Sequence, residues 1–172
     1  MSMDPSQLKV VNYPEAVLRQ RAEPVESVDE QVRLVAKRMI ELMHEHRGVG
    51  LAAPQVGLSL RMFVCCPTGE PEDEQVFINP MISEPTKEMA WLEEGCLSLP
   101  EIRGEINRPV GVTIEALDEF GEKFVMQSDD FPARVWQHEF DHLEGILIID
   151  KMKMVDRMAN RRMIKELEAM VK

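Results

Sequence analysis

Length, composition and charge exclude several classes of protein. The chain has 172 residues, 44% hydrophobic and 30% charged, and carries a net charge of -11 at pH 7. The length predicts one domain over residues 1–172, large enough to bury a core, and the composition is that of a soluble globular protein. So acidic a chain does not bind nucleic acid or an anionic membrane with its whole surface, and no apolar run approaches the roughly 18 residues of a membrane helix.

The cysteines and the first residues indicate a cytoplasmic protein. Three cysteines, an odd number, do not make a disulfide framework, so we expect reduced thiols. The first nine residues contain no hydrophobic segment typical of a secretion signal. We therefore expect a cytoplasmic location.

The pattern of elements predicts an α+β fold, with short, mainly antiparallel strands wrapped around one central helix. Ser27 and Glu30 match a capping box, and the helix that follows should end before Gly48 and bury one apolar stripe, made of Val32, Val35, Met39 and Met43. Strands are expected at 60–66, 75–79, 111–117 and 123–127, with a hairpin turn at 118–121. The central helix should cover 132–143, with Pro132 in its first turn and Gly145 just past its end, and an amphipathic C-terminal helix should cover 154–172.

The central helix carries an HExxH motif. His138 and His142 are four residues apart, so both imidazoles leave the helix on one side and can hold a divalent metal ion. Glu139 can then reach a water bound to the metal. A separate stripe of Trp136, Phe140 and Leu143 should pack in the core. The alternative is a pair of surface histidines with a chance glutamate.

A catalytic metal site of this kind needs a third protein ligand, and Cys96 is the best candidate. It lies in the segment EEGCLSLP (93–100), where a lone thiol has no obvious packing role, and a metal would bind it as thiolate. The alternative is a small buried apolar residue. Cys65 and Cys66 lie in an apolar strand, point to opposite faces and receive no role.

A third segment, GVGLAAPQ (48–55), is small, apolar and uncharged. It lacks the third glycine of a dinucleotide fingerprint and the Gly-Lys-Ser/Thr of a phosphate-binding loop. Small residues let a backbone approach a bound chain, and Gln55 offers an amide donor. The alternative is a tightly packed connection between helix and strand.

Together the three segments resemble the peptide deformylases, the metallohydrolases that remove the formyl group from N-formylmethionyl peptides. The family signatures G-φ-G-φ-A-A-x-Q, E-G-C-L-S and H-E-x-D-H read here as GVGLAAPQ (48–55), EGCLS (94–98) and HEFDH (138–142). The likeness extends through NYPEAVLRQRAEPV (12–25) and ARVWQHEFDHLEGILIID (133–150), and so covers nearly the whole chain.

The resemblance implies a role for each residue of the motifs. Cys96, His138 and His142 hold the metal, and Glu139 acts as general base and then general acid. The Gln55 side chain and the Leu97 backbone N–H donate hydrogen bonds to the oxyanion. The remaining implied roles are substrate-backbone contacts at Val49 and Gly50, a methionine-pocket wall at Val135, and support of the metal ligands by Glu94 and Asp141, which could instead form plain ion pairs with an arginine such as Arg108. The implied metal is Fe²⁺, with Zn²⁺, Ni²⁺ or Co²⁺ able to occupy the site, and the donor set does not choose among them.

Two rival functions and one further partner stay open. An HExxH zinc endopeptidase would take a glutamate such as Glu166 or Glu168 as its third ligand, and an inactive protein of the same fold would only bind formyl peptides. Residues 150–172 hold seven Lys/Arg against four acids, a net +3 that leaves -14 on residues 1–149. Some bacterial deformylases dock a C-terminal helix near the ribosomal exit, so the resemblance implies ribosome contact here, without nucleic-acid recognition by the catalytic body. An ordinary charged helix is the alternative.

Overall fold

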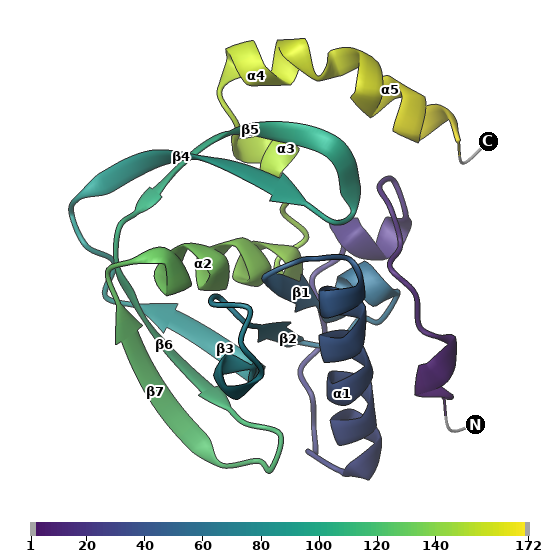
Figure 1. Cartoon of the computed structure of the whole chain (residues 1–172), viewed down its shortest axis with the longest axis vertical. Coiled ribbons are helices and arrows are strands. Elements are labelled where there is room, and N and C mark those ends of the chain that lie inside the picture. The colour runs from purple at the N-terminus through teal and green to yellow at the C-terminus, as the bar shows by residue number, and fades with distance from the viewer. Residues whose placement is uncertain (1–2, 171–172) are drawn as a thin grey trace.

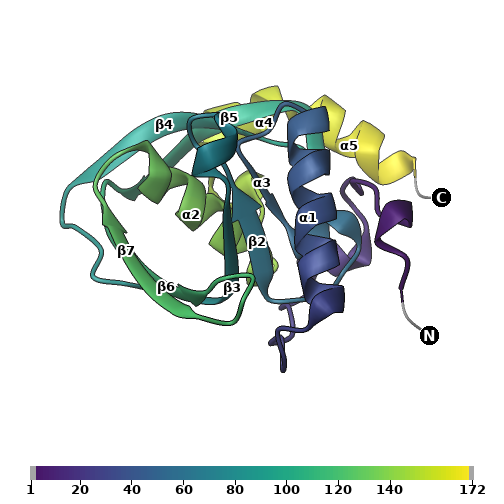
Figure 2. The same ribbon diagram turned by 60° about the horizontal axis from the view of Figure 1, so that its bottom comes forward.

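Two antiparallel sheets enclose one central helix in the computed structural model, which describes residues 3–170 (Figure 1). The larger sheet has the strand order β1-β2-β3-β6-β7, with β1 (Gly50–Ala52), β2 (Met62–Cys65), β3 (Gln75–Ser83), β6 (Val112–Leu117) and β7 (Lys123–Ser128). The smaller sheet pairs β4 (Met89–Cys96) with β5 (Leu99–Pro109). Helix α2 (Phe131–Leu143) lies between them (Figures 1 and 2), which confirms the predicted α+β arrangement.

The four predicted strands are present as β2, β3, β6 and β7, and the predicted turn joins the last two. In this turn the Asp118 N–H donates to the Glu122 carbonyl over 2.9 Å, and Gly121 has a φ of 80°. That left-handed conformation favours glycine. Strands β1, β4 and β5 were not predicted.

Helix α1 (Glu30–Glu45) packs against β1 and β2 (Figure 2). The Asp29 carboxylate accepts a hydrogen bond from the Val32 N–H over 2.9 Å and so caps the helix. The predicted capping box at Ser27 is therefore wrong, because an aspartate two residues later, directly before the helix, accepts the capping hydrogen bond instead. The predicted apolar stripe is confirmed: Val35, Met39 and Met43 are buried, and Val32 is partly buried beside them.

Both faces of β2 are buried, so this strand separates two parts of the core. Met62 and Val64 pack with the apolar stripe of α1, whereas Phe63 and Cys65 pack toward α2. The stripe predicted on α2 is only partly correct. Trp136 and Leu143 are buried, but Phe140 is half-buried, with the Arg61 guanidinium 5.3 Å from its ring centroid.

The predicted C-terminal helix is two helices, α4 (Met154–Ala159) and α5 (Arg161–Ala169), which follow the short α3 (Ile148–Lys151). They meet at the buried Asn160, whose side-chain amide donates to the Arg103 carbonyl in β5 over 2.7 Å and to the Asp156 carbonyl over 2.8 Å. Residues 171 and 172 of the prediction lie outside the described residues. Short 3-10 helices occur at Pro5–Gln7, Ala16–Arg19, Ala53–Val56 (η3) and Pro71–Asp73.

The cysteines at 65 and 66 are buried free thiols that belong to different parts of the core. Across residues 3–170, none of the helices combines the length and the apolar character needed to cross a membrane.

Candidate metal centre

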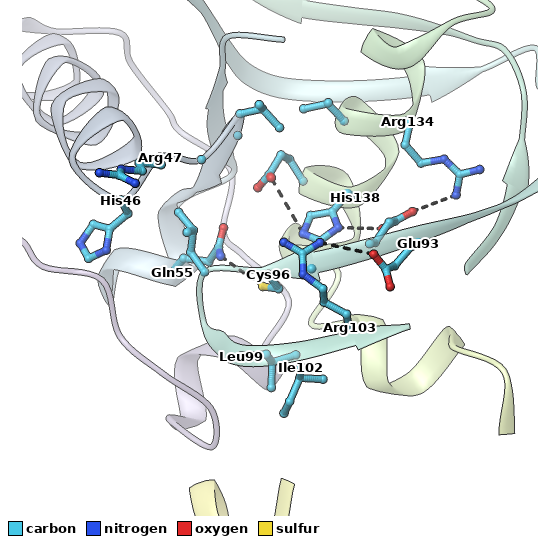
Figure 3. Close-up of a pocket in the computed structure, with 18 of the residues that line it drawn as sticks. His46, Arg47, Gln55, Glu93, Cys96, Leu99, Ile102, Arg103, Arg134 and His138 are labelled. Atoms are coloured by element: carbon cyan, nitrogen blue, oxygen red, sulfur yellow. Dashed lines mark hydrogen bonds and ion pairs between the residues drawn. The ribbon is translucent and has the colours of Figure 1, made fainter. Parts of the chain in front are cut away.

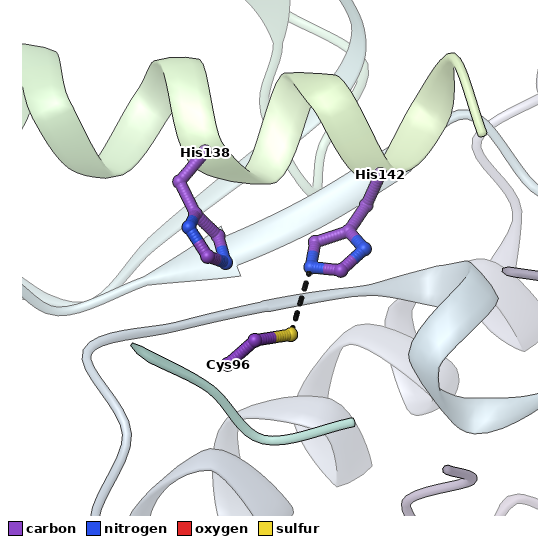
Figure 4. A group of neighbouring side chains, drawn as sticks. All are labelled: Cys96, His138 and His142. Carbon is purple, nitrogen blue, oxygen red and sulfur yellow. Dashed lines mark hydrogen bonds between the residues drawn. The ribbon is translucent and has the colours of Figure 1, made fainter. Parts of the chain in front are cut away.

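Three side chains from two elements converge beside α2. His138 and His142 project from this helix, and Cys96 ends β4 (Figure 4). One ligand atom from each side chain lies within 4.8 Å of the other two, and the Cys96 Sγ is 3.4 Å from the His142 Nε2. The structure thus brings together the three residues that the motifs single out.

The chemistry of this group fits a divalent metal ion. One thiol and two imidazoles suit zinc and ferrous iron alike. Burial, and then the charge of His138, lower the pKa of His142 well below its usual value, which favours the neutral imidazole that a metal needs. The His142 Nδ1 and the Glu139 Oε2 are buried and find no hydrogen-bond partner among residues 3–170. Buried polar atoms are seldom left without a hydrogen-bond partner, so these two atoms remain available to a ligand of the centre.

The carboxylate of Glu94 fixes the orientation of His138. Its Oε1 lies 2.8 Å from the His138 Nδ1. Burial alone would raise the pKa of Glu94, but hydrogen bonds from His138 and Arg108 hold it well below its usual value. The ionised carboxylate can only accept, so Nδ1 carries a hydrogen and Nε2 is the ring nitrogen left to bind a metal. Burial alone would lower the pKa of His138, but hydrogen bonds with Cys96 and Glu94 raise it well above its usual value, so Nε2 must give up a proton when a metal binds. Asp141 instead forms ion pairs, with Arg108 at 2.8 Å and Lys151 at 2.9 Å.

The Glu139 side chain is buried next to the backbone of β1. A Cβ on Gly50 would lie 2.5 Å from the Glu139 Oε1, so only glycine leaves room for this carboxylate. Burial raises the pKa of Glu139 to about 7, with the charge of His138 acting in the opposite direction. A carboxyl group with such a pKa can both accept and return a proton near neutral pH.

Gln55 lies in η3 with its side chain turned toward the metal-ligand group. Its Oε1 accepts from the Ala52 N–H over 2.9 Å, which fixes the amide. Its Nε2 then lies 3.5 Å from the Cys96 Sγ (Figure 3). The same nitrogen lies 3.3 Å from the Ser98 Oγ. The amide donor therefore sits beside the metal ligands.

A cavity of about 540 Å³ opens onto these groups. Leu97, Val49, Gly50 and Val135, the other residues named from the motifs, all line it. Leu92 and Phe131 add apolar surface. Leu99 and Ile102 add more, and polar side chains come from His46, Arg47 and Arg103 (Figure 3).

The glutamates of the rival ligand set lie elsewhere. Glu166 pairs with Arg162 on α5 over 2.9 Å, and Glu168 accepts from the Tyr13 hydroxyl over 2.8 Å. Neither belongs to the group of potential ligands found among residues 3–170.

Sequence reasoning missed Arg134 and Ser98. Arg134 is buried and donates to Glu94 over 2.8 Å. The signal that could have found it is its position four residues before His138, on the same side of the helix. Ser98 lies within the EGCLS motif and is fully buried beside Gln55.

Comparisons with known proteins identify the family of the chain. The family model described as Polypeptide deformylase matches residues 7–158. The chain is 44% identical to peptide deformylase of Thermotoga neapolitana over 155 residues, which cover 90% of this chain and 93% of that protein. It is 42% identical to peptide deformylase 1B, chloroplastic/mitochondrial, of Arabidopsis thaliana over 147 residues, 84% of this chain. The matched part is 54% of that plant protein, so the chain spans about half of its length.

The structure matches a crystal structure of peptide deformylase from Plasmodium falciparum with a TM-score of 0.91 and 41% identity. The match covers 94% of this chain and 95% of that one. The fold and most of the sequence agree with these relatives. The chain therefore belongs to the polypeptide deformylase family.

Proposed function

We propose that this protein is a metal-dependent hydrolase that removes the formyl group from N-formylmethionyl peptides and releases formate. The observation that carries the proposal is the convergence of Cys96, His138 and His142 beside a buried Glu139. Family membership supports the same activity.

Cys96, His138 and His142 would hold the metal, Fe²⁺ in the cell, with Zn²⁺, Ni²⁺ or Co²⁺ as substitutes. When bound, a divalent metal supplies Lewis-acid catalysis and lowers the pKa of water. Glu139 takes the proton of the attacking water and delivers it to the departing amine. Its burial beside Gly50 keeps competing solvent away from this carboxylate.

Gln55 and Leu97 would stabilise the oxygen of the formyl carbonyl as it gains negative charge. The Gln55 amide is already fixed by the Ala52 N–H, so it needs no reorganisation during the reaction. The backbone N–H of Leu97, the residue after Cys96, is the second donor. One donor of this kind contributes about 3 kcal/mol to lowering the barrier.

The cavity supports a preference for formylmethionine. Val135 and the neighbouring leucine, isoleucine and phenylalanine side chains offer apolar surface for a methionine side chain. Val49 and Gly50 would contact the peptide backbone. A formyl group carries only hydrogen on its carbonyl carbon, so a tight wall near the metal would admit it and exclude an acetyl group.

The rival endopeptidase differs in its third metal ligand, so bound metal distinguishes the two. We expect Cys96→Ser to lose metal and Glu166→Gln to retain it, measured on the purified proteins. Loss of metal in Glu166→Gln alone, or cleavage of casein by the wild-type protein, would favour the endopeptidase.

The C-terminal helices are proposed as a contact with the ribosome in the cytoplasm, where formylated chains emerge. Arg161 and Lys165 are exposed on α5, and Met154, Val155 and Met158 are exposed on α4. The positive charges of Arg161 and Lys165 suit the phosphates of ribosomal RNA. Deleting the helices would also remove the contacts of Asn160 with β5, so charge reversal is the sharper test.

We expect Arg161→Glu combined with Lys165→Glu to weaken co-sedimentation with ribosomes at low salt while deformylation of a short peptide is unchanged. Unchanged co-sedimentation would contradict this contact.

A further inference from the structure

Arg134 is a buried cation next to the metal-ligand group that the mechanism above does not use. Its side chain is only 8% exposed, and it lies one helical turn before His138 on α2. The guanidinium donates three hydrogen bonds: to the Glu94 Oε2 over 2.8 Å, to the Ile106 carbonyl over 3.0 Å and to the Ala90 carbonyl over 2.9 Å.

The carboxylate of Glu94 has its hydrogen-bonding capacity filled by three side chains. Its Oε1 accepts from the His138 Nδ1 over 2.8 Å and from the Arg108 Nη2 over 3.0 Å. Its Oε2 accepts from the Arg108 Nε and from the Arg134 Nη1, both over 2.8 Å. Since Glu94 orients His138, the two arginines fix the imidazole through the carboxylate.

Both arginines join the small sheet to α2, one from each side. Arg108 lies in β5, and its remaining guanidinium nitrogen reaches Asp141 on α2 over 2.8 Å. Arg134 lies on α2, and its two other bonds reach carbonyls in β4 and β5. Arg134 therefore ties the helix that carries both histidines to the strand that ends in Cys96.

The spacing between Cys96 and the histidines depends on how the small sheet sits on α2. Several side-chain bonds join this sheet to the helix: those of Arg134 to the Ala90 and Ile106 carbonyls, that of Gln137 to the Pro109 carbonyl over 3.0 Å, and that of Arg108 to Asp141. Arg134 bonds carbonyls of both strands of the sheet. A buried guanidinium can make this attachment because two of its nitrogens, held in one rigid plane, reach the three acceptors, whereas all three N–H donors of a lysine lie on a single nitrogen.

We propose that Arg134 is a positioning residue for the metal centre, which holds Glu94 in place for His138 and sets the distance between Cys96 and the two histidines. The inference rests on the proposed metal function and deepens it. The alternative is a buried ion pair that contributes only to folding.

Co²⁺ binding separates these roles, because its visible absorption reports ligand geometry and its thiolate charge-transfer band reports Cys96. We expect Arg134→Met to bind Co²⁺ about 10–100-fold more weakly, in chelator competition, and to show a shifted visible spectrum. Arg134→Lys keeps the charge but not the three bonds, so its spectrum should also shift, and it carries the test if Arg134→Met does not fold.

Arg61→Met is the matched control. Arg61 is equally buried and bonds Glu144 and the Leu143 carbonyl at the other end of α2. We expect Arg61→Met to lose thermal stability, as Arg134→Met does. Its Co²⁺ affinity and its visible spectrum should stay those of the wild type.

Wild-type affinity and spectrum in both Arg134 variants would overturn this inference alone. Failure of the wild-type protein to bind Co²⁺, or an unchanged spectrum in Cys96→Ser, would instead overturn the proposed metal function and this inference with it.

Discussion

At the scale of single residues, the position of Glu139 depends on the absence of a side chain at residue 50. The Glu139 carboxylate occupies the space that a Cβ of Gly50 would need. The conformation of Gly50 itself is not left-handed, so the glycine is required for space and not for backbone freedom.

We predict that Gly50→Ala displaces Glu139 and lowers kcat/KM for a formyl peptide by about 100-fold, since a shift of about 1 Å at a reacting group has that effect. The free energy of unfolding should fall by about 1–3 kcal/mol, as for other overpacked sites. Steady-state kinetics and urea denaturation measure the two effects.

Gly48→Ala is the control for this variant. Its Cβ would meet the end of the Leu97 side chain at 2.9 Å, which can rotate away, so we expect a much smaller loss of activity. Equal losses in both variants would contradict the role given to Gly50.

The motifs identify most of the site residues, but not the hydrogen bonds that hold those residues in place. Cys96, His138 and His142 could be chosen from residue type and spacing, because a metal needs those donors. The bonds of Arg134 could not, because its partners Ala90 and Ile106 are backbone carbonyls far away in the chain. Any residue type at 90 or 106 would offer the same acceptor, so no sequence signal marks them.

At the scale of elements, the start of α1 shows how a local pattern can mislead. Ser27 and Glu30 have the spacing of a capping box, yet Asp29 makes the capping hydrogen bond. Serine and aspartate are both common helix caps, and which of them caps α1 depends on where the chain turns out of the preceding segment.

We predict that Asp29→Ala lowers the free energy of unfolding by about 1 kcal/mol, because the Val32 N–H loses its acceptor. Ser27→Ala, on an exposed residue, should leave it unchanged. Chemical denaturation of the two variants measures the difference. A larger loss of unfolding free energy in Ser27→Ala than in Asp29→Ala would show that Ser27 caps the helix.

Strands β4 and β5 could not be predicted for a physical reason. Most side chains of β4 are exposed or half-buried, and its one buried side chain is the charged Glu94. The alternation of apolar and polar residues that marks a half-buried strand is therefore missing from β4. In β5 burial alternates from Ile102 to Arg108, but a glycine and a charged residue, Gly104 and Arg108, occupy two of the buried positions. The two long strands are stabilised by pairing with each other and by buried charges, which composition does not show.

At the scale of the whole molecule, the candidate site joins three distant parts of the chain. Gln55 and Gly50 come from the first third, Cys96 from the small sheet, and the histidines from α2. The three metal ligands, Cys96, His138 and His142, meet only in the folded chain. Metal binding and stability should therefore depend on each other.

We predict that Zn²⁺ at about 100 times its dissociation constant stabilises the wild-type protein by about 2.7 kcal/mol, seen as a higher Tm. Cys96→Ser should lose most of this gain, because one of the three ligands is gone. The same rise in Tm in both proteins would show that the metal binds elsewhere.

The most direct test of the proposed function is the product released from two blocked dipeptides by the Fe²⁺-loaded protein. We expect formate from formyl-Met-Ala and no acetate from acetyl-Met-Ala. Binding of formyl-Met-Ala without release of formate would show an inactive protein of the same fold, and would contradict the proposed activity.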